Sequence, residues 1–116
     1  MVTIMTQFEI WFANLPAVGG SIQSGMRPVV IVSNNAANQY SPVVTAVPLT
    51  SNLHKTVLPT HVLLREAGLK SPSLALCEQI LSVDKSCLVR RIGSVESSFS
   101  RLALRHALLV QLNLAA

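Results

Sequence analysis

The sequence predicts a mainly β protein of the α+β class, in which a small β-barrel is followed by one C-terminal α-helix. Short apolar segments separated by clusters of Gly, Pro, Asn and Ser fill most of the chain, as expected for strands joined by turns. Uninterrupted helical periodicity occurs only near the C-terminus. At 116 residues the chain suits one domain, so we expect a single domain over 1–116, with the barrel at about 7–93 and the helix at about 95–112.

A glycine-rich loop separates the first two expected strands. The first strand, residues 8–13, is rich in aromatic and branched side chains and ends before Pro16. The second strand, residues 28–33, begins at a proline, which cannot donate to a ladder. Arg27 is thus expected at the corner where the polar loop meets the strand. The loop contains three glycines, which allow backbone conformations that other residues avoid: Gly19, Gly20 and Gly25.

The middle of the chain alternates between strands and turns. Residues 34–41 are expected to form a polar loop, and 84–88 a single helical turn capped by Asp84. Because the strands are short and almost continuously apolar, we expect them to close around a core as in a small barrel. The remaining expected strands are 42–47, which Pro48 ends, 60–64, 73–83 and 89–93.

The last expected element is a helix that begins at Ser94 or Ser97 and runs to about Leu112. Its final turns are apolar on nearly every side, so the helix needs cover from more than the barrel. Half of all residues are hydrophobic and only 12% are charged, with a mean hydropathy of +0.49. This is more apolar surface than a compact monomer of this size easily buries, so we expect a partner surface, most simply that of a homodimer.

The charge balance and the cysteines narrow the function classes. A net charge of +4 and a pI near 9.7 favour a polyanionic partner, either a nucleic acid or an acidic protein. Cys77 and Cys87 lack zinc-site spacing, so we expect buried free thiols in a reducing cytoplasm. The chain does not start with a secretory signal pattern, and the uncharged segment 28–53 is interrupted too often to span a membrane. We therefore predict a cytoplasmic location and no membrane partner.

Two polar loops next to strand ends form the candidate site. Arg27 belongs to the first loop, and Thr50 and Ser51 follow the third strand, with His54 and Lys55 close behind. In a small barrel two such loops can face one cleft, which would place a guanidinium beside hydroxyls and an ammonium and would suit a phosphate. The alternative is that Arg27 is an ordinary surface cation and that the hydroxyls make turn hydrogen bonds.

Other classes of chemistry lack a pattern in the sequence. No glycine-rich phosphate loop, nucleotide fingerprint or zinc pattern occurs, so we predict neither a cofactor nor a metal. Of the three histidines, only His54 lies in a loop beside hydroxyls. The carboxylates are too scattered to suggest a divalent-metal cluster for hydrolysis: Glu9, Glu66, Glu78, Asp84 and Glu96.

Four separated motifs closely resemble those of the MazF/PemK family, the endoribonuclease toxins of bacterial toxin–antitoxin pairs. They occur in the family's order and read GSIQSGMRPVVIVSNN, SPVVTAVPLTS, LPTHV and LALCEQILSVDK. The resemblance extends from about Glu9 to the terminal helix. It implies an SH3-like β-barrel of the MazF/PemK/CcdB type with a C-terminal helix, a homodimer, and cleavage of single-stranded RNA at short sequence motifs without metal or cofactor.

The resemblance also implies roles for individual residues. Arg27 in the motif GMRP and Thr50 in PLTS match the pair with which such toxins cleave RNA. A cognate antitoxin is the implied partner, and we expect its acidic, partly disordered C-terminal segment to lie over the RNA groove and fold on binding. The residues implied to line this groove are Ser21, Gln23, Asn34, Ser51, Lys55 and Gln79.

The expected reaction is attack by the RNA's own 2′ hydroxyl on the adjacent phosphorus, which leaves a 2′,3′-cyclic phosphate and a 5′ hydroxyl. Negative charge grows on the phosphate in the transition state, and Arg27 is suited to stabilise that charge. Thr50 is expected to orient the phosphate by a hydrogen bond. The general base stays open, with His54 and Glu78 as candidates.

Two other hypotheses remain at this point. One is a toxin on the same barrel that binds a protein target such as gyrase through the end of the helix. Another is a barrel without enzymatic activity that binds RNA or protein. The Arg27→Ala variant separates the ribonuclease from the gyrase-binding toxin, because it should abolish RNA cutting but leave gyrase-type growth arrest intact. Retention of uncut RNA on the wild-type protein would indicate the barrel without enzymatic activity.

Overall fold

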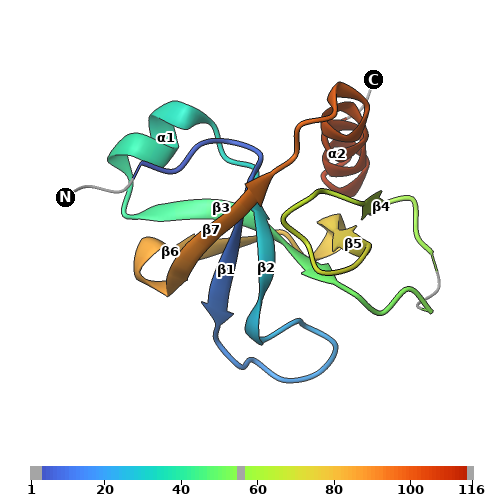
Figure 1. Cartoon of the computed structure of the whole chain (residues 1–116), viewed down its shortest axis with the longest axis horizontal. Coiled ribbons are helices and arrows are strands. Elements are labelled where there is room, and N and C mark those ends of the chain that lie inside the picture. The colour runs from blue at the N-terminus through green and yellow to red at the C-terminus, as the bar shows by residue number, and fades with distance from the viewer. Residues whose placement is uncertain (1–3, 55–56, 115–116) are drawn as a thin grey trace.

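The computed structural model describes residues 4–54 and 57–114, which form a curved sheet with a C-terminal helix (Figure 1). A mainly β chain that ends in one substantial helix is therefore confirmed. The elements in chain order are β1 Glu9–Leu15, β2 Gly25–Ile31, α1 Asn35–Tyr40, β3 Val43–Thr50, β4 His61–Leu64, β5 Ser73–Leu76, the 3-10 turn η1 Cys77–Gln79, β6 Leu81–Asp84, the 3-10 turn η2 Lys85–Cys87, β7 Leu88–Ser94 and α2 Ser98–Gln111.

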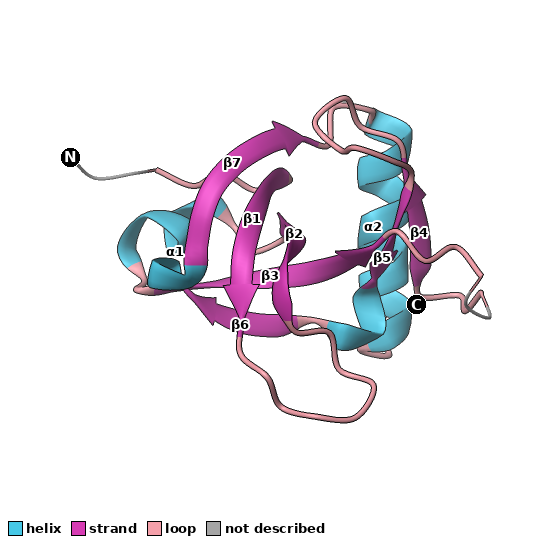
Figure 2. Cartoon of the chain, turned by 60° about the horizontal axis from the view of Figure 1, so that its bottom comes forward, coloured by secondary structure: helices cyan, strands magenta, loops and turns pink. Residues whose placement is uncertain are grey.

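All described strand pairs are antiparallel and belong to one sheet in the order β4-β5-β3-β2-β1-β7, with β6 also paired to β3. Figure 2 shows the strands curving around a shared interior, with α2 across the β4 and β5 side. Within the described residues β4 and β7 do not pair, so the sheet is open and differs from the closed barrel expected. Packing closes this gap instead, because Gly68 lies so close to the Ile92 carbonyl that a side chain would not fit there.

Strand β3 is longer than the sequence suggested and runs through Pro48, which we had expected to end it. One edge of β3 pairs with β2, where Pro48 lies opposite Val29. The other edge pairs with β6 over Val43–Ala46 and with β5 over 49–50. Pro48 thus lies where this second edge changes partner, and its missing N–H costs no ladder hydrogen bond on that edge.

The expected loop at 34–41 is wrong, because residues Asn35–Tyr40 form the short helix α1. The Asn34 side chain caps this helix by accepting a hydrogen bond from the Ala37 N–H at 2.9 Å. Asn38, fully buried, donates from Nδ2 to the Ser33 carbonyl at 2.8 Å. Asn34 and Asn38, which suggested a loop, instead form hydrogen bonds with backbone groups of the short helix and of Ser33, which precedes it.

The expected strand over 73–83 is also wrong, since the 3-10 turn η1 divides it into β5 and β6. Both parts pair with the same edge of β3: Ala75 lies opposite Leu49, and Leu81 lies opposite Ala46. The chain takes six steps between Ala75 and Leu81, while β3 takes three between Leu49 and Ala46. The turn η1 holds the extra residues outside the ladder.

Alternating residues of β2 supply two apolar clusters on opposite faces. Val30 packs with Ile10, Leu49 and the helix residue Leu104 on the α2 side. Val29 and Ile31 pack in the second cluster, whose members also include Trp11, Val44, Ala46 and Val83. The period of two along a strand accounts for this division.

Helix α2 begins at the predicted N-cap Ser97, whose hydroxyl accepts from the Ser100 N–H at 3.3 Å. It packs on β4 and η1 through the buried Leu104 and Ala107. The expected helical turn after Asp84 is confirmed as η2, because the Asp84 carboxylate accepts from the Ser86 N–H at 2.9 Å. No helix in the described residues is long and apolar enough to cross a membrane.

Both cysteines are free, but only Cys77 is buried and Cys87 is half-buried. Burial, reinforced by the nearby charge of Glu78, raises the pKa of Cys77 to about 12. A thiol with such a pKa stays protonated and is a poor nucleophile at neutral pH. Cys77 therefore belongs to the core and not to a reactive site.

Candidate functional site

A cleft of about 840 Å³ lies where β2 and β3 meet β7 and the connection between β4 and β5. It contains both Arg27 and Thr50, which the sequence had placed in separate loops. Its lining residues are Phe12, Gln23, Met26, Arg27, Pro28, Leu49, Thr50, Ser51, Asn52, Gly68, Leu69, Lys70, Ser71, Ser73, Arg90, Arg91 and Ile92.

Arg27 lies in β2 and is held half-buried by two backbone carbonyls. Its Nε donates to the Ser24 carbonyl at 2.9 Å, and one terminal nitrogen donates to the Leu49 carbonyl at 3.4 Å. These contacts use part of the guanidinium fork and leave its other donors free to meet a ligand in the cleft. The side chain is thus fixed before any anion arrives.

Thr50 occupies the end of β3 and is only 9% exposed. In the register of β2 and β3, Val29 lies opposite Pro48. Continuing that register by two residues places Arg27 opposite Thr50. The Thr50 Oγ1 accepts from the Asn52 N–H at 3.2 Å, so the turn hydrogen bond that was weighed as an alternative does form. The hydroxyl proton of Thr50 remains available as a donor.

The charges on the cleft wall are all positive. Lys70, Arg90 and Arg91 join Arg27, and no Asp or Glu is among the described lining residues. Such a wall attracts polyanions and repels other cations. The cleft is therefore suited to phosphate groups, with hydroxyls of Thr50 and Ser51 beside them.

The two arginines of β7 differ in their surroundings. The Arg90 guanidinium lies over the Phe12 ring, 4.9 Å from the ring centroid. Arg91 Nε donates to the Glu9 Oε2 at 3.0 Å, and that carboxylate also accepts from the Trp11 indole through its other oxygen. Arg91 is thus partly neutralised by Glu9, whereas Arg90 keeps its charge beside an aromatic surface.

The β1–β2 loop reaches the cleft through Gln23, and Gln79 of η1 holds this loop in place. The Gln79 side chain accepts from the Gln23 N–H at 2.8 Å and donates to the Ser21 carbonyl at 3.1 Å. Gly19, Gly20 and Gly25 have φ values of 83°, 63° and 76°, the left-handed conformations that glycine tolerates. Ser21 and Gln79 border the loop but do not line the cleft.

The remaining groove candidates separate in space. Ser51 lines the cleft, whereas Asn34 caps α1 and lies outside the lining. His54 is exposed and also outside the lining, and its N–H donates to the Asn52 side chain at 3.1 Å. Lys55 lies outside the described residues.

Glu78, the other candidate base, is engaged in a separate cluster. Its Oε1 accepts from the Thr60 hydroxyl at 3.0 Å, and its Oε2 lies 2.9 Å from His61 Nε2. The Leu58 N–H donates to His61 Nδ1 at 3.2 Å, so the neutral ring carries its proton on Nε2 and donates to Glu78. Burial acts to raise the pKa of Glu78, but hydrogen bonds from His61, the backbone and Thr60 together lower it.

Sequence reasoning missed the cleft residues that lie far from the two expected loops. Phe12, Lys70, Arg90 and Arg91 come from β1, the β4–β5 connection and β7. One signal was present: Arg90 and Arg91 are adjacent cations on an expected strand, so this strand brings positive charge to any cleft beside it. Which cleft this is depends on the pairing of β1 with β7.

Residues that could hold a metal do not gather in the described parts of the chain. No group of three or more His, Cys, Asp or Glu side chains has a suitable arrangement among residues 4–54 and 57–114. Glu78 accepts hydrogen bonds from both His61 and Thr60, so neither of its carboxylate oxygens is left without a partner. The cleft itself offers cations and hydroxyls, which are ligands for an anion.

The chain is similar to known proteins of one family. The family model described as "PemK-like, MazF-like toxin of type II toxin-antitoxin system" matches residues 6–110. Endoribonuclease MazF of Staphylococcus saprophyticus is 37% identical over 91 residues, covering 77% of this chain and 76% of that protein. Endoribonuclease EndoA of Bacillus subtilis is 36% identical over 95 residues, covering 80% of this chain and 82% of that protein.

Solved structures share the fold. MazF from Deinococcus radiodurans superposes with a TM-score of 0.81 at 22% identity, covering 97% of this chain and 99% of that one. A mycobacterial endoribonuclease, solved in complex with its cognate antitoxin, superposes with a TM-score of 0.77 at 25% identity, covering 97% and 98%. Since the family model spans nearly the whole chain and two relatives exceed 30% identity over most of their length, this chain belongs to the PemK-like, MazF-like toxins of type II toxin–antitoxin systems.

Proposed function

We propose that this toxin is an endoribonuclease that cuts single-stranded RNA in the cleft between β2, β3 and β7, without a metal or cofactor. The observation that carries the proposal is that Arg27 and Thr50 line one cleft, whose described lining residues include four cations and no carboxylate. The relatives from S. saprophyticus and B. subtilis are both named as endoribonucleases, which supports the same activity here.

In the proposed reaction the RNA supplies its own nucleophile. The 2′ oxygen forms a bond to the adjacent phosphorus, and the bond from phosphorus to the 5′ oxygen breaks. The 2′ hydroxyl loses its proton, and the departing 5′ oxygen gains one. The products are a 2′,3′-cyclic phosphate and a 5′ hydroxyl, and no water or cofactor is consumed in this step.

Arg27 acts by electrostatic stabilisation of the phosphate. Its Nε and one terminal nitrogen already bind the Ser24 and Leu49 carbonyls, so the guanidinium does not have to be reoriented when charge develops. An arginine keeps its proton at any physiological pH, which suits it to charge stabilisation and not to proton transfer.

Thr50 orients the same phosphate. Its Oγ1 accepts from the Asn52 N–H, which fixes the side chain and leaves its proton to donate to a phosphate oxygen. We leave His54 and Glu78 out of the proposed catalytic set, because neither lines the cleft and both Glu78 oxygens are engaged.

RNA binding in the proposal relies on a subset of the residues that the motifs suggested. Gln23 and Ser51 line the cleft and can bind bases or phosphates, and Gln79 holds the loop that bears Gln23. Lys70 and Arg90 add charge that the motifs did not indicate. Asn34 is assigned to the α1 cap and is not included, while Lys55 remains a prediction from sequence.

We also propose a homodimer and a cognate antitoxin with an acidic segment. Helix α2 and the residues that follow it expose six large apolar side chains, which a second subunit would cover: Phe99, Leu102, Leu109, Val110, Leu112 and Leu114. The cationic cleft suits an acidic antitoxin segment as well as RNA, so that inhibition would be direct competition. Because such an enzyme acts on cellular RNA, we place it in the cytoplasm.

The test is cleavage of a long mixed-sequence RNA by purified protein in the presence of a chelator. We expect discrete cuts with 5′ hydroxyl ends, mapped by primer extension. The Arg27→Ala substitution should lower kcat by about 10²–10³-fold, because it removes a preorganised hydrogen-bond donor that stabilises the negative charge developing on the phosphate. Arg27→Lys keeps the charge without the fork and should be intermediate.

Arg65→Ala is the matched control, because Arg65 is an exposed arginine outside the cleft lining. Its cleavage rate should equal that of the wild type. Undiminished cutting by Arg27→Ala would remove Arg27 from the mechanism. Growth arrest that persists in cells producing Arg27→Ala without RNA cutting would contradict the ribonuclease proposal as a whole.

A further inference from the structure

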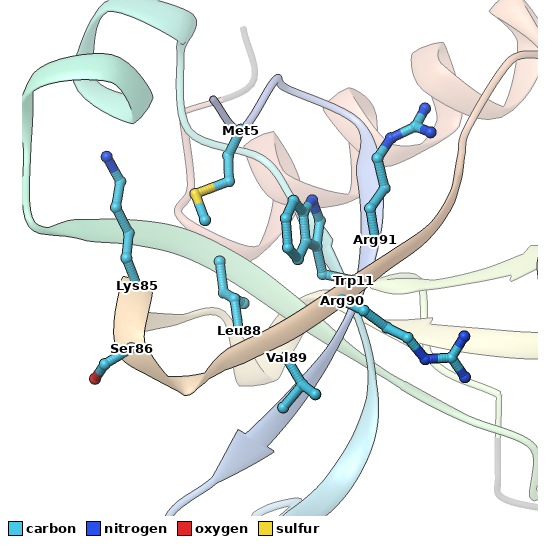
Figure 3. A pocket seen from close by; sticks show the side chains of 8 residues that line it. All are labelled: Met5, Trp11, Lys85, Ser86, Leu88, Val89, Arg90 and Arg91. Atoms are coloured by element: carbon cyan, nitrogen blue, oxygen red, sulfur yellow. The ribbon is translucent and has the colours of Figure 1, made fainter. Parts of the chain in front are cut away.

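A second cavity of about 600 Å³ lies next to the cleft and shares two residues of β7 with it. Figure 3 shows its side chains: Met5, Trp11 and Leu88 gather at the centre, Lys85 lies on one side and the two arginines on the other. Its lining residues are Met5, Trp11, Lys85, Ser86, Leu88, Val89, Arg90 and Arg91. We call this cavity the β7 pocket.

The β7 pocket and the cleft are continuous through shared residues. Arg90 and Arg91 line both cavities, so a ligand that leaves the cleft across β7 meets the pocket next. Val89, Arg90 and Arg91 are three successive exposed residues of β7. A strand exposed in this way at the end of the sheet order is open to a ligand lying across it.

The charge of the β7 pocket matches that of the cleft. Lys85, Arg90 and Arg91 line it, and its described lining contains no carboxylate. Glu9 partly neutralises Arg91 at 3.0 Å, which leaves Lys85 and Arg90 as the cations available to a ligand. Together the two cavities present a basic track from Arg27 to Lys85, which suits a chain of successive phosphates.

The floor of the β7 pocket is apolar and aromatic. Trp11 and Met5 are each 5% exposed and form the buried base of the pocket, while Val89 is 57% exposed. The Arg90 guanidinium already lies on the Phe12 ring, and its opposite face can stack on a nucleobase. Apolar and planar surfaces beside cations are the combination that binds unpaired bases together with their phosphates.

We infer that the β7 pocket is a subsite for nucleotides that flank the cleavage site, so that RNA extends from the cleft across Arg90 to Lys85. This inference rests on the proposed ribonuclease function. A nucleic acid fits better than an acidic protein segment, because the track continues the cleft in which RNA is cut. The subsite predicts tighter binding of RNA that is long enough to reach Lys85.

The experiment compares two RNAs that share one cleavage site, a short one of about 6 nucleotides and one of about 16 nucleotides that extends on both sides. Each is also made with a 2′-deoxy nucleotide at the cut, which removes the nucleophile, so that binding is measured without cleavage by fluorescence anisotropy. Wild-type protein should bind the long RNA at least about tenfold more tightly than the short one.

Lys85→Gln is the informative variant, because Lys85 lines the β7 pocket but not the cleft. It should weaken binding of the long RNA several-fold and reduce the slope of log K against log salt by about 0.7, the value for one phosphate contact to a single strand. Cleavage of the short RNA should stay unchanged. Ser86→Glu, at the exposed rim of the pocket, should have the same selective effect by repulsion.

Arg65→Gln removes one exposed charge outside both cavities and should leave the length preference intact. The subsite is overturned if Lys85→Gln keeps the wild-type preference for the long RNA, or if it weakens both RNAs equally. It is also overturned if Lys85→Gln lowers affinity only for poly-L-glutamate, which would assign the pocket to an acidic protein. Failure of the ribonuclease proposal looks different, since wild-type protein would then cut neither RNA.

Discussion

Glu78 illustrates at the residue scale how a side chain next to a motif can have a structural role. Its two carboxylate oxygens accept from Thr60 and His61, which lie at the start of β4, while Glu78 itself lies in η1. These hydrogen bonds connect two elements that the sheet does not pair. A carboxylate that is already satisfied and has a lowered pKa is a weak base, which fits this structural role better than proton transfer.

Glu78→Gln should destabilise the fold more at neutral pH than at acidic pH. The folded pKa of Glu78 lies below its ordinary value of 4.5, so the contribution of the carboxylate is complete above that value and disappears as pH falls through the lower, folded pKa. Urea unfolding at about pH 7 should show a loss of roughly 1 kcal/mol in the free energy of unfolding, and this loss should shrink as the pH is lowered below 4.5.

Glu96→Gln, at an exposed carboxylate, serves as the control and should change little at either pH. An equal loss of stability by Glu78→Gln at both pH values would contradict the charge-dependent role. RNA cleavage by Glu78→Gln at neutral pH should remain within a few-fold of the wild type, because the carboxylate lies outside the cleft lining.

At the scale of elements, η1 connects the sheet to the loop that borders the cleft. The turn contains the extra residues between β5 and β6 that have no pairing partner on β3. Gln79, which belongs to this turn, therefore projects away from the ladder. Gln79 then meets the β1–β2 loop with both ends of its amide. A loop with three left-handed glycines has much conformational freedom to lose, so this cross-link has a large effect on the order of the cleft wall.

Gln79→Ala should raise KM for RNA about fivefold to tenfold with a smaller change in kcat, because two hydrogen bonds that order the loop are lost. Hydrogen exchange at the Gln23 N–H should accelerate in the RNA-free variant, which direct contact of Gln79 with RNA alone would not cause. Gln39→Ala, an exposed glutamine on α1, should change neither quantity. Unaltered exchange at Gln23 would show that Gln79 does not position the loop.

At the scale of the whole molecule, the apolar residues of α2 are divided between two surfaces. Leu104 and Ala107 are buried against β4 and η1, whereas Phe99 is 80% exposed and Leu112 is 50% exposed. A single subunit therefore does not bury all of the hydrophobic residues that the sequence contains. Several large apolar side chains exposed on one helix are typical of an interface between proteins.

Substitution of Leu109 and Leu112 by Gln should weaken the proposed homodimer. Leu109 lies in the last turn of α2 and Leu112 is its C-cap residue, and both are exposed, so their replacement should leave the fold intact while the interface loses apolar area. Sedimentation velocity at micromolar concentration should shift from dimer toward monomer. Tyr40→Gln, at an exposed position of α1, is the control and should stay dimeric. An interface at this end of α2 would be contradicted if the wild type were a monomer or if the variant with Gln at 109 and 112 stayed dimeric.

The sequence by itself determined much of the fold and two of the residues central to the site. Local composition identifies β1, β4, η2 and α2, because apolar runs, turn residues and caps act over a few neighbours. Arg27 and Thr50 stood out because each lies next to a polar loop at an expected strand end. The three glycines of the first loop have the positive φ values that glycine permits.

Only the tertiary structure decided what depends on pairing between distant segments. The pairing of β2 with β3 brings Arg27 and Thr50 to one cleft. The unequal lengths of β3 and the 75–81 segment create η1 and direct Gln79 toward the first loop. The pairing of β7 with β1 brings Arg90 to Phe12 and to the cleft. Such contacts link residues 22–78 positions apart, and local sequence preferences contain no information on the register that joins them.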